Sequence, residues 1–357
     1  MTRSKVFLPE LDGLRFAAFL LIFIHHSLSN NMIILRDIAD IGWLGVEIFF
    51  CLSAFLLTRL LLREITQFGN VDVYKFFVRR ILRIWPLYFG YILLAIILSS
   101  CLHVITSHNW HRVIGLLTFT DDFFAAFEGF NPIRFTGHLW TISYEEQFYL
   151  CLPFLIPWLI HQPPAKRLRF LMVILAISQL AKCISIYDQR ADPFIWTMPF
   201  THLESIVMGI IIAFYEQDCM RLNRTWVGLL MVSSAAVVFF LPDTTVVSYH
   251  LVLVYLLAGV FSASVVCLVI NEHTRLLRSF LSNGVVSFLG KISFGLYVFH
   301  NICLHVSDVV LGRSLPLLNF VVALLGVVLI SSASYGLFER RFLLLKKTRF
   351  TRIPVSS

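Results

Sequence analysis

The chain has 357 residues, of which 58% are hydrophobic and only 14% are charged. This composition excludes an ordinary soluble globular domain and indicates a protein that crosses a membrane many times. The seven cysteines are scattered and form no C-x-x-C pair, so neither a disulfide framework nor a zinc site is expected.

Ten apolar segments are each long enough to cross about 30 Å of hydrocarbon as a helix, which takes roughly 20 residues. They lie near residues 12–31, 41–58, 84–104, 139–160, 168–187, 200–215, 225–242, 250–270, 284–306 and 316–338. No small-residue cleavage pattern follows the first segment, so we expect a retained span and not a signal peptide. The sequence therefore predicts an all-α, polytopic transmembrane helix bundle of about ten spans.

The basic residues are distributed unevenly between the two sides of this predicted bundle. If the N-terminus is cytoplasmic, all but six of the 29 lysines and arginines lie in inner segments, and those six are Arg36, Arg112, Arg134, Lys182, Arg190 and Arg313. The positive-inside rule then predicts that both termini are cytoplasmic. The net charge of +8 needs no nucleic-acid partner. We expect a transmembrane domain over 1–345 and a short basic cytoplasmic tail over 346–357. The basic stretch 340–352 is expected to lie along the lipids of the inner leaflet.

Ionisable residues inside the predicted spans are few and clustered. The first span contains His25 and His26 in "LIFIHHSL", the fourth contains Glu145 and Glu146 in "YEEQF", and the ninth contains His300 at the end of "ISFGLYVFH". A charged residue near the middle of a span costs about 2.5–3.5 kcal/mol, so such residues indicate a functional site. Structural hydrogen bonding is the alternative for each of them.

Helical geometry distinguishes the two adjacent histidines. At 100° and 1.5 Å per residue, His26 lies about 20° from the face of Arg15 and about 16 Å along the axis. His25 falls about 80° to one side of Arg15. His26 is also expected at a depth similar to that of Glu145, whereas Glu146 points about 100° away from Glu145. We therefore predict functional roles for His26 and Glu145 and structural roles for the other two.

A cluster of arginines precedes the third span in "FFVRRILRIWPLY". Arg80 and Arg83 are three residues apart and so are neighbours on one helix face. Paired guanidiniums suit phosphate recognition, although contacts with lipid headgroups are an alternative. The histidines His103, His108 and His111 have loosely ligand-like spacing, but no cysteine or carboxylate cluster accompanies them. They indicate a solvated loop, and no metal is expected.

Several motifs follow one another in the order found in one family of bacterial membrane enzymes. They are "ELDGLRFAAFLLIFIHHSL" (10–28), "GVEIFFCLSAFLLT" (45–58), "RRILRIWPLY" (79–88), "LWTISYEEQFYL" (139–150), "ISFGLYVFH" (292–300) and "FERRF" (338–342). Together they resemble the acyltransferase type 3 family, whose members O-acylate carbohydrates. The resemblance places the basic residue and histidine of the family's opening motif at Arg15 and His26, and its R-x-x-R motif at Arg80 and Arg83.

The chain departs from the family pattern at two positions. Ala54 stands where the family usually has glycine, and Thr141 replaces the usual serine but keeps the hydroxyl. Glycine permits close backbone approach, so the methyl group of Ala54 is expected to narrow a channel or to shift the second span. The chain ends soon after the last span, so the extra extracellular domain of some relatives is not expected.

The resemblance implies an O-acyltransferase of the bacterial cytoplasmic (inner) membrane. It implies acyl-CoA as the donor substrate, with acetyl as the expected acyl group and no permanently bound cofactor. The implied acceptor is a hydroxyl of a cell-surface glycan, such as lipopolysaccharide O-antigen or exopolysaccharide. A transporter or flippase of a glycan or a lipid-linked intermediate is the alternative from a different class, and a membrane-embedded sensor or scaffold is a third.

Each predicted site residue has an expected role within this resemblance. Arg15, Arg80 and Arg83 would bind the CoA phosphates, while the pantetheine arm would reach toward His26. His26 would act as general base or carry the acyl group covalently, and Glu145 would orient its imidazole. The expected supporting or acceptor-contacting residues are Ser143, Tyr149 and His300.

Overall fold

The computed structural model describes residues 8–28, 39–102, 109–190, 192–271, 273–312 and 315–351. All of the regular structure in these ranges is helical, so the predicted all-α fold is confirmed. Four of the residues discussed above lie outside the described ranges, namely Arg36, His103, His108 and Arg313.

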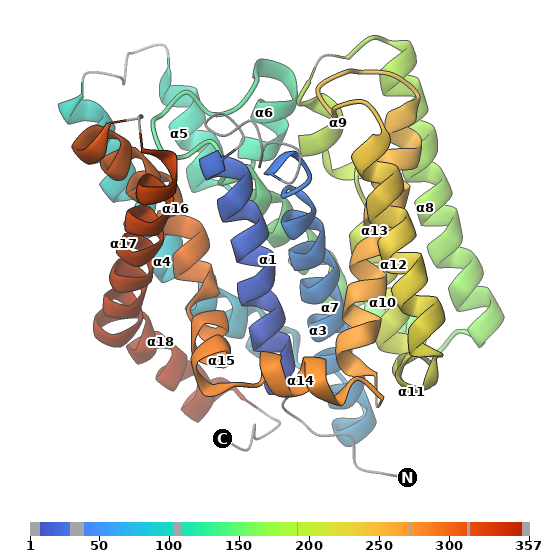
Figure 1. Ribbon diagram of the computed structural model, residues 1–357. Coiled ribbons are helices and arrows are strands. Elements are labelled where there is room, and N and C mark those ends of the chain that lie inside the picture. The colour runs from blue at the N-terminus through green and yellow to red at the C-terminus, as the bar shows by residue number, and fades with distance from the viewer. Residues whose placement is uncertain are drawn as a thin grey trace.

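The long helices run alternately up and down between the two ends of the molecule (Figure 1). In chain order they are α1 (Pro9–Leu28), α3 (Leu44–Phe68), α4 (Val73–Cys101), α7 (Trp140–Ile160), α8 (Pro164–Tyr187), α10 (Glu204–Phe214), α12 (Arg224–Phe240), α13 (His250–Ile270), α16 (Ser293–Leu311) and α17 (Pro316–Ser334). This alternation places the start of α1 and the end of α17 at the same end of the bundle (Figure 1).

Short helices close the two ends. One end, the α6 end, carries α5 (Trp110–Leu117), α6 (Asp121–Glu128), α9 (Phe194–Thr197) and η2 (Pro199–Thr201). The other end, the α14 end, carries α11 (Glu216–Arg221), α14 (Arg275–Leu281), α15 (Gly284–Lys291), η3 (Tyr335–Glu339), α18 (Arg340–Leu345) and η4 (Lys346–Phe350).

Seven helices of the described chain are long and apolar enough to cross a membrane. They are α1, α3, α4, α8, α13, α16 and the continuous helical run Pro316–Phe350. Three further segments of the predicted ten form α7, α10 and α12. Of these, α10 has 11 residues and α12 has 17, whereas α7 contains the polar run Glu145, Glu146, Gln147. The structure thus supports a multi-pass membrane protein with seven clear spans, and helix continues across the 345/346 boundary.

Helix α3 is the centre of the packing, because α10, α1, α13 and α7 all contact it. Its closest approach to α10 is at Gly209, where an added Cβ would lie 2.3 Å from the Cys51 carbonyl oxygen and 2.8 Å from the Ala54 Cβ. Ala54 is fully buried. Its methyl group therefore lies at the α3–α10 contact, and both expected effects of this methyl group stay predictions.

Gly209→Ala is expected to destabilise the protein by about 1–3 kcal/mol, because the new methyl group would overlap the backbone of α3. Thermal unfolding of the purified protein in detergent would measure this as a lower Tm. Gly228→Ala in α12 is the matched control, since no atom lies within 4 Å of its added Cβ. Equal Tm values for the two variants would contradict the close approach of α3 and α10.

Candidate active site

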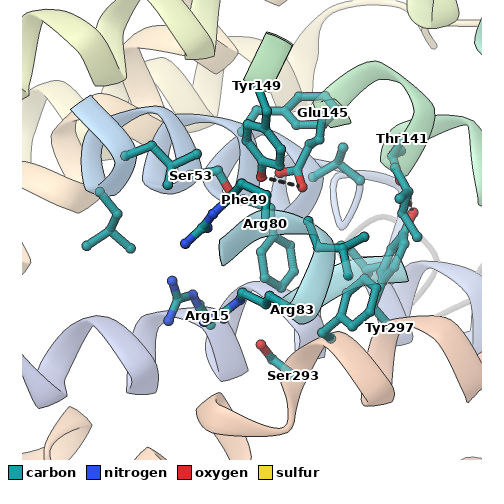
Figure 2. Close-up of a pocket in the computed structure, with 18 residues that line it drawn as sticks. Arg15, Phe49, Ser53, Arg80, Arg83, Thr141, Glu145, Tyr149, Ser293 and Tyr297 are labelled. Carbon is teal, nitrogen blue, oxygen red and sulfur yellow. Dashed lines mark hydrogen bonds between the residues drawn. The ribbon is translucent and has the colours of Figure 1, made fainter. Parts of the chain in front are cut away.

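A cavity of about 830 Å³, open solvent included, lies between α1, α3, α4, α7 and α16. We call it the basic cavity, because Arg15, Arg80 and Arg83 line it. Figure 2 shows the three arginine side chains converging on one part of the cavity, with Glu145 and Tyr149 on another side. The structure therefore brings the three predicted phosphate ligands together with the predicted acidic residue.

Backbone contacts at the α14 end fix the position of Arg15. Gly13 lies against α14, where an added Cβ would be 2.2 Å from the Leu281 carbonyl oxygen. One residue earlier, Asp12 meets α15, since a Cβ on Gly290 would lie 1.8 Å from the Asp12 carbonyl oxygen. The D-G-L-R motif thus seats the start of α1 tightly on these helices and points Arg15 into the cavity.

The three arginines differ in their partners. Arg15 Nη1 donates to Asp12 Oδ1 at 2.7 Å. Arg80 Nε is buried and finds no hydrogen-bond partner in the described part of the chain. Arg80 and Arg83 also take no part in the ion pairs among the described residues. Guanidinium groups shielded from solvent ordinarily have partners, so these two half-buried arginines are suited to an anionic ligand.

A fourth cation belongs to this basic group and was missed by the sequence motifs. Lys346 of η4 is close enough to Arg83, Arg80 and Arg15 for electrostatic interaction. The neighbouring Arg79 anchors the end of η4, because its Nη1 donates to the Phe350 carbonyl oxygen at 3.1 Å. The predicted basic tail therefore supplies a side chain to the basic cavity region.

Glu145 lies in the same cavity, where several hydroxyl groups surround it. The Tyr149 hydroxyl donates to Glu145 Oε2 at 2.9 Å, as Figure 2 shows. Ser53, Thr141 and Tyr297 also line the cavity and add three hydroxyl groups. Of the predicted supporting residues, Tyr149 is thus placed in the cavity beside Glu145.

His26 lies in a cluster of histidines and not beside Glu145. Its Nδ1 is 2.8 Å from Nε2 of His300, and the two rings stack with centroids 4.9 Å apart. The ring of His138 meets that of His300 edge-on at 4.8 Å. Among the described residues, His26 is thus hydrogen-bonded to His300, and Glu145 to Tyr149. The expectation that Glu145 orients His26 is therefore corrected, because His300 occupies the orienting position.

The hydrogen bonds of His300 determine which nitrogen of each ring carries the proton. His300 Nδ1 lies 2.5 Å from the carbonyl oxygen of Tyr297, which can only accept, so this Nδ1 is protonated. In the neutral ring, Nε2 of His300 must then accept from Nδ1 of His26. The remaining lone pair of His26 is on Nε2. His26 is exposed, whereas His300 is fully buried. His26 therefore has the tautomer and the access that a general base requires.

Tyr297 connects the histidine cluster to the basic cavity. Its hydroxyl lies 2.8 Å from the carbonyl oxygen of His138 and 2.7 Å from the hydroxyl of Thr141. Both Tyr297 and Thr141 line the basic cavity. Thr141 precedes Glu145 by about one helical turn. The Glu145 carboxylate therefore lies about 6 Å further along α7 than the contact between Thr141 and Tyr297.

A second cavity, of about 1330 Å³ with open solvent included, lies at the α6 end. We call it the aspartate cavity, because Asp40, Asp192 and Asp243 line it. His25 lines this cavity, whereas Ile22, one turn earlier on α1, lines the basic cavity. His26 follows His25 directly on α1 and is itself not among the described residues that line either cavity.

The comparisons with known proteins agree with this arrangement. A family model described as "Acyltransferase domain" matches residues 8–336. The chain belongs to this acyltransferase family. Two relatives are the O-acetyltransferase OatA of Staphylococcus aureus strain MRSA252 and that of strain NCTC 8325, each 25% identical to this chain. The alignments cover 98% and 94% of this chain but only 61% and 57% of the relatives' length. No solved structure gives a significant match.

The family's E-E-Q motif has three separate contacts. Glu145 lines the basic cavity, whereas Glu146 Oε2 accepts from Trp85 Nε1 of α4 at 3.3 Å. Gln147 Nε2 donates to Asp122 Oδ1 of α6 at 2.8 Å. The structural role predicted for Glu146 is consistent with this contact.

The remaining predicted residues lie apart from the reacting groups. Ser143 is fully buried, and neither cavity is lined by it in the described structure. His111 is exposed and bonds to Glu128 at 2.7 Å. Within the described ranges, no three His, Cys, Asp or Glu side chains are grouped so that they could hold a metal ion.

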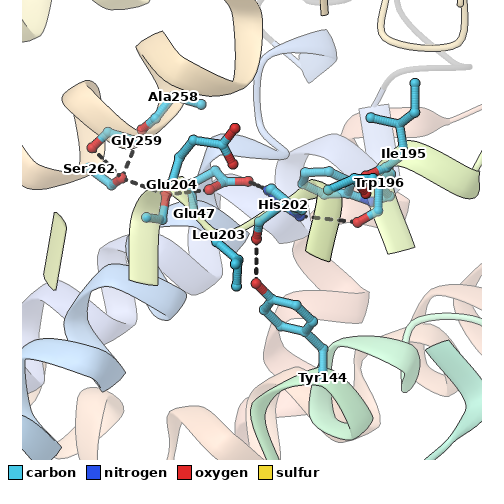
Figure 3. A network of polar contacts seen from close by, with 12 residues as sticks. Glu47, Tyr144, Ile195, Trp196, His202, Leu203, Glu204, Ala258, Gly259 and Ser262 are labelled. Atoms are coloured by element: carbon cyan, nitrogen blue, oxygen red, sulfur yellow. Dashed lines mark hydrogen bonds and ion pairs between the residues drawn. The ribbon is translucent and has the colours of Figure 1, made fainter. Parts of the chain in front are cut away.

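A second polar network, shown in Figure 3, was not predicted from the sequence. Glu47 of α3 bonds to both His202 and Ser205, and Ser205 lies 3.1 Å from Ser262 of α13. Lys182, which the charge pattern assigned to an outer segment, is buried and pairs with Glu204. Both carboxylates stand in apolar sequence contexts, and only the tertiary packing of α3, α8, α10 and α13 reveals their partners.

Proposed function

We propose that the protein is a membrane-embedded O-acetyltransferase that transfers the acetyl group of acetyl-CoA to a hydroxyl of a cell-surface glycan. The observation that carries this proposal is the tautomer of His26, whose Nδ1 donates to His300 and whose Nε2 keeps a free lone pair. Family membership and the OatA relatives support the acyl-transfer class. A multi-pass protein of this class would act in the bacterial cytoplasmic membrane.

The basic cavity suits acetyl-CoA as donor. The CoA phosphates would occupy the cluster formed by Arg15, Arg80 and Arg83, where charge-assisted hydrogen bonds to guanidinium groups are strong. Arg15 and His26 lie about 16 Å apart along α1, a distance that an extended pantetheine arm can span. The thioester would then reach the histidine cluster without free acetate crossing the bilayer.

The chemical step needs one base and no further reagent. Nε2 of His26 removes the proton of the acceptor hydroxyl while that oxygen attacks the thioester carbonyl carbon. The new C–O bond forms, the C–S bond breaks, and the proton held by His26 passes to the departing CoA thiolate. His300 accepts from Nδ1 of His26 and so supports the imidazolium that forms, as a third group does in hydrolytic triads.

Arg83→Ala and Arg80→Ala are each expected to raise the KM for acetyl-CoA about tenfold, because each loses a charge-assisted bond to phosphate. Transfer rates in proteoliposomes at varied acetyl-CoA concentration would measure the effect. Arg169→Ala is the matched control, since this arginine is exposed near the start of α8. An unchanged KM in both cavity variants would contradict the phosphate role.

A further inference from the structure

The aspartate cavity is a built pocket with aromatic walls. Trp43 precedes α3 and Trp196 lies in α9, and their rings meet edge-on with centroids 5.2 Å apart. Phe130 and Phe239 also line the cavity. Flat aromatic surfaces of this kind pack against the C–H faces of sugar rings, and concave sites with aromatic walls and a few polar groups are typical of ligand pockets.

Carboxylates and hydroxyls supply the polar contacts of this cavity. Asp40, Asp192 and Asp243 line it together with the hydroxyls of Thr244 and Thr245. Asp243 is held in a tight turn, because its Oδ1 accepts from the Thr245 backbone N–H at 2.8 Å. Carboxylates accept hydrogen bonds from hydroxyl groups, so these side chains match the donors of a sugar ring.

The charge of the aspartate cavity selects among sugars. No lysine or arginine is present among the described residues that line it. Three carboxylates without a lysine or arginine among the described lining residues give the site an excess of negative charge, and burial together with the neighbouring Asp243 raises the pKa of Asp192. A further anionic group would be repelled there, whereas a neutral or cationic one would not.

The back wall of the cavity is fixed by the buried network of Figure 3. His202 Nδ1 lies 3.1 Å from the carbonyl oxygen of Trp196, and the two rings are 4.7 Å apart. Glu47 bonds to the other nitrogen of His202. These contacts hold the Trp196 ring rigidly, as a binding surface requires.

The cavity also adjoins the reacting histidine. His25 lines it, and the rings of His25 and His26 are 5.3 Å apart. Trp43, just before α3, lines the aspartate cavity, and Val46 of α3, three residues later, lines the basic cavity.

We propose that the aspartate cavity binds one neutral or cationic sugar unit of the glycan acceptor and excludes acidic sugars. This inference rests on the proposed function, because it assigns the acceptor side of the same transfer reaction. The sugar would lie against the aromatic wall that includes Trp196 and present a hydroxyl toward His26, while Asp192 and Asp243 accept hydrogen bonds from its other hydroxyls.

Binding of three defined probes to the purified full chain would test this proposal. Methyl glucoside, methyl glucosaminide and methyl glucuronide would be titrated in saturation-transfer NMR experiments. We expect millimolar binding of the first two and about tenfold weaker binding of the glucuronide. The double variant Asp192→Asn/Asp243→Asn should reduce that discrimination, and Trp196→Ala should weaken all three probes about tenfold.

Matched control variants and a measurement of acetyl-CoA binding distinguish a failure of the acceptor assignment from a failure of the proposed function. Asp218→Asn and Trp226→Ala change exposed residues of α11 and α12 and should leave probe binding unchanged. Acetyl-CoA binding is measured on the same preparations. If acetyl-CoA binds but no probe does, or if the glucuronide binds as well as the glucoside, the acceptor assignment is overturned and the proposed function stands. If acetyl-CoA fails to bind as well, the proposed function falls with it.

Discussion

His26→Ala is expected to reduce acetyl transfer by about 10²–10⁴-fold, because it removes the only base assigned to the acceptor hydroxyl. The binding of acetyl-CoA should persist, since the cationic groups of the basic cavity are untouched. Transfer of radiolabelled acetyl from acetyl-CoA to surface polysaccharide in membranes would measure the loss. Retained acetyl-CoA affinity would show that the variant is folded.

Two histidine variants serve as comparisons for His26→Ala. His25 Nδ1 lies 2.8 Å from the Ala39 carbonyl oxygen, and this residue lines the aspartate cavity. His25→Ala should therefore retain much of the maximal rate and act mainly on the KM for the acceptor. His161→Ala alters an exposed residue after α7 and should have no effect. A greater loss of rate from His25→Ala than from His26→Ala would contradict the assignment.

His300→Phe is expected to reduce kcat about 100-fold, because the acceptor that fixes the tautomer of His26 is lost. Phenylalanine keeps an aromatic ring beside Phe19, whose centroid lies 6.4 Å from that of His300. His300→Gln should restore part of the activity, since its amide oxygen can accept from Nδ1 of His26. Steady-state kinetics with acetyl-CoA would separate kcat from KM.

The two substitutions at His300 distinguish positioning from packing. If His300 had a purely structural role, phenylalanine would replace it better than glutamine. Both variants would then differ from the wild type more in Tm than in kcat. If His300→Phe is as active as the wild type, His300 is a packing residue and the tautomer of His26 is set in another way.

Much of the candidate site could be predicted from local sequence. Helical phase places Arg15 and His26 on one stripe of α1, and the spacing of Arg80 and Arg83 makes them neighbours on α4. These predictions need only the geometry of a single helix. The structure accordingly brings the three arginines and Glu145 to one cavity.

The partners across helices could not be predicted in the same way. The depths estimated from the sequence are similar for Glu145 and His26. Similar depth in the membrane does not determine which helices are adjacent. His300 faces His26 because α16 packs beside α1, and Glu145 faces the arginines. The surroundings of Ala54 likewise include Gly209, a residue more than 150 positions away in sequence.

A single-turnover experiment tests the central claim most directly. Purified protein in proteoliposomes would be loaded with radiolabelled acetyl-CoA, mixed with isolated surface polysaccharide, and assayed for label on the polysaccharide. We predict that the wild type transfers the label and that His26→Ala binds acetyl-CoA equally well but transfers the label about 10²–10⁴-fold more slowly. A wild type that binds or moves polysaccharide without transferring label would indicate a transporter, and transfer by His26→Ala at the wild-type rate would contradict the role of His26.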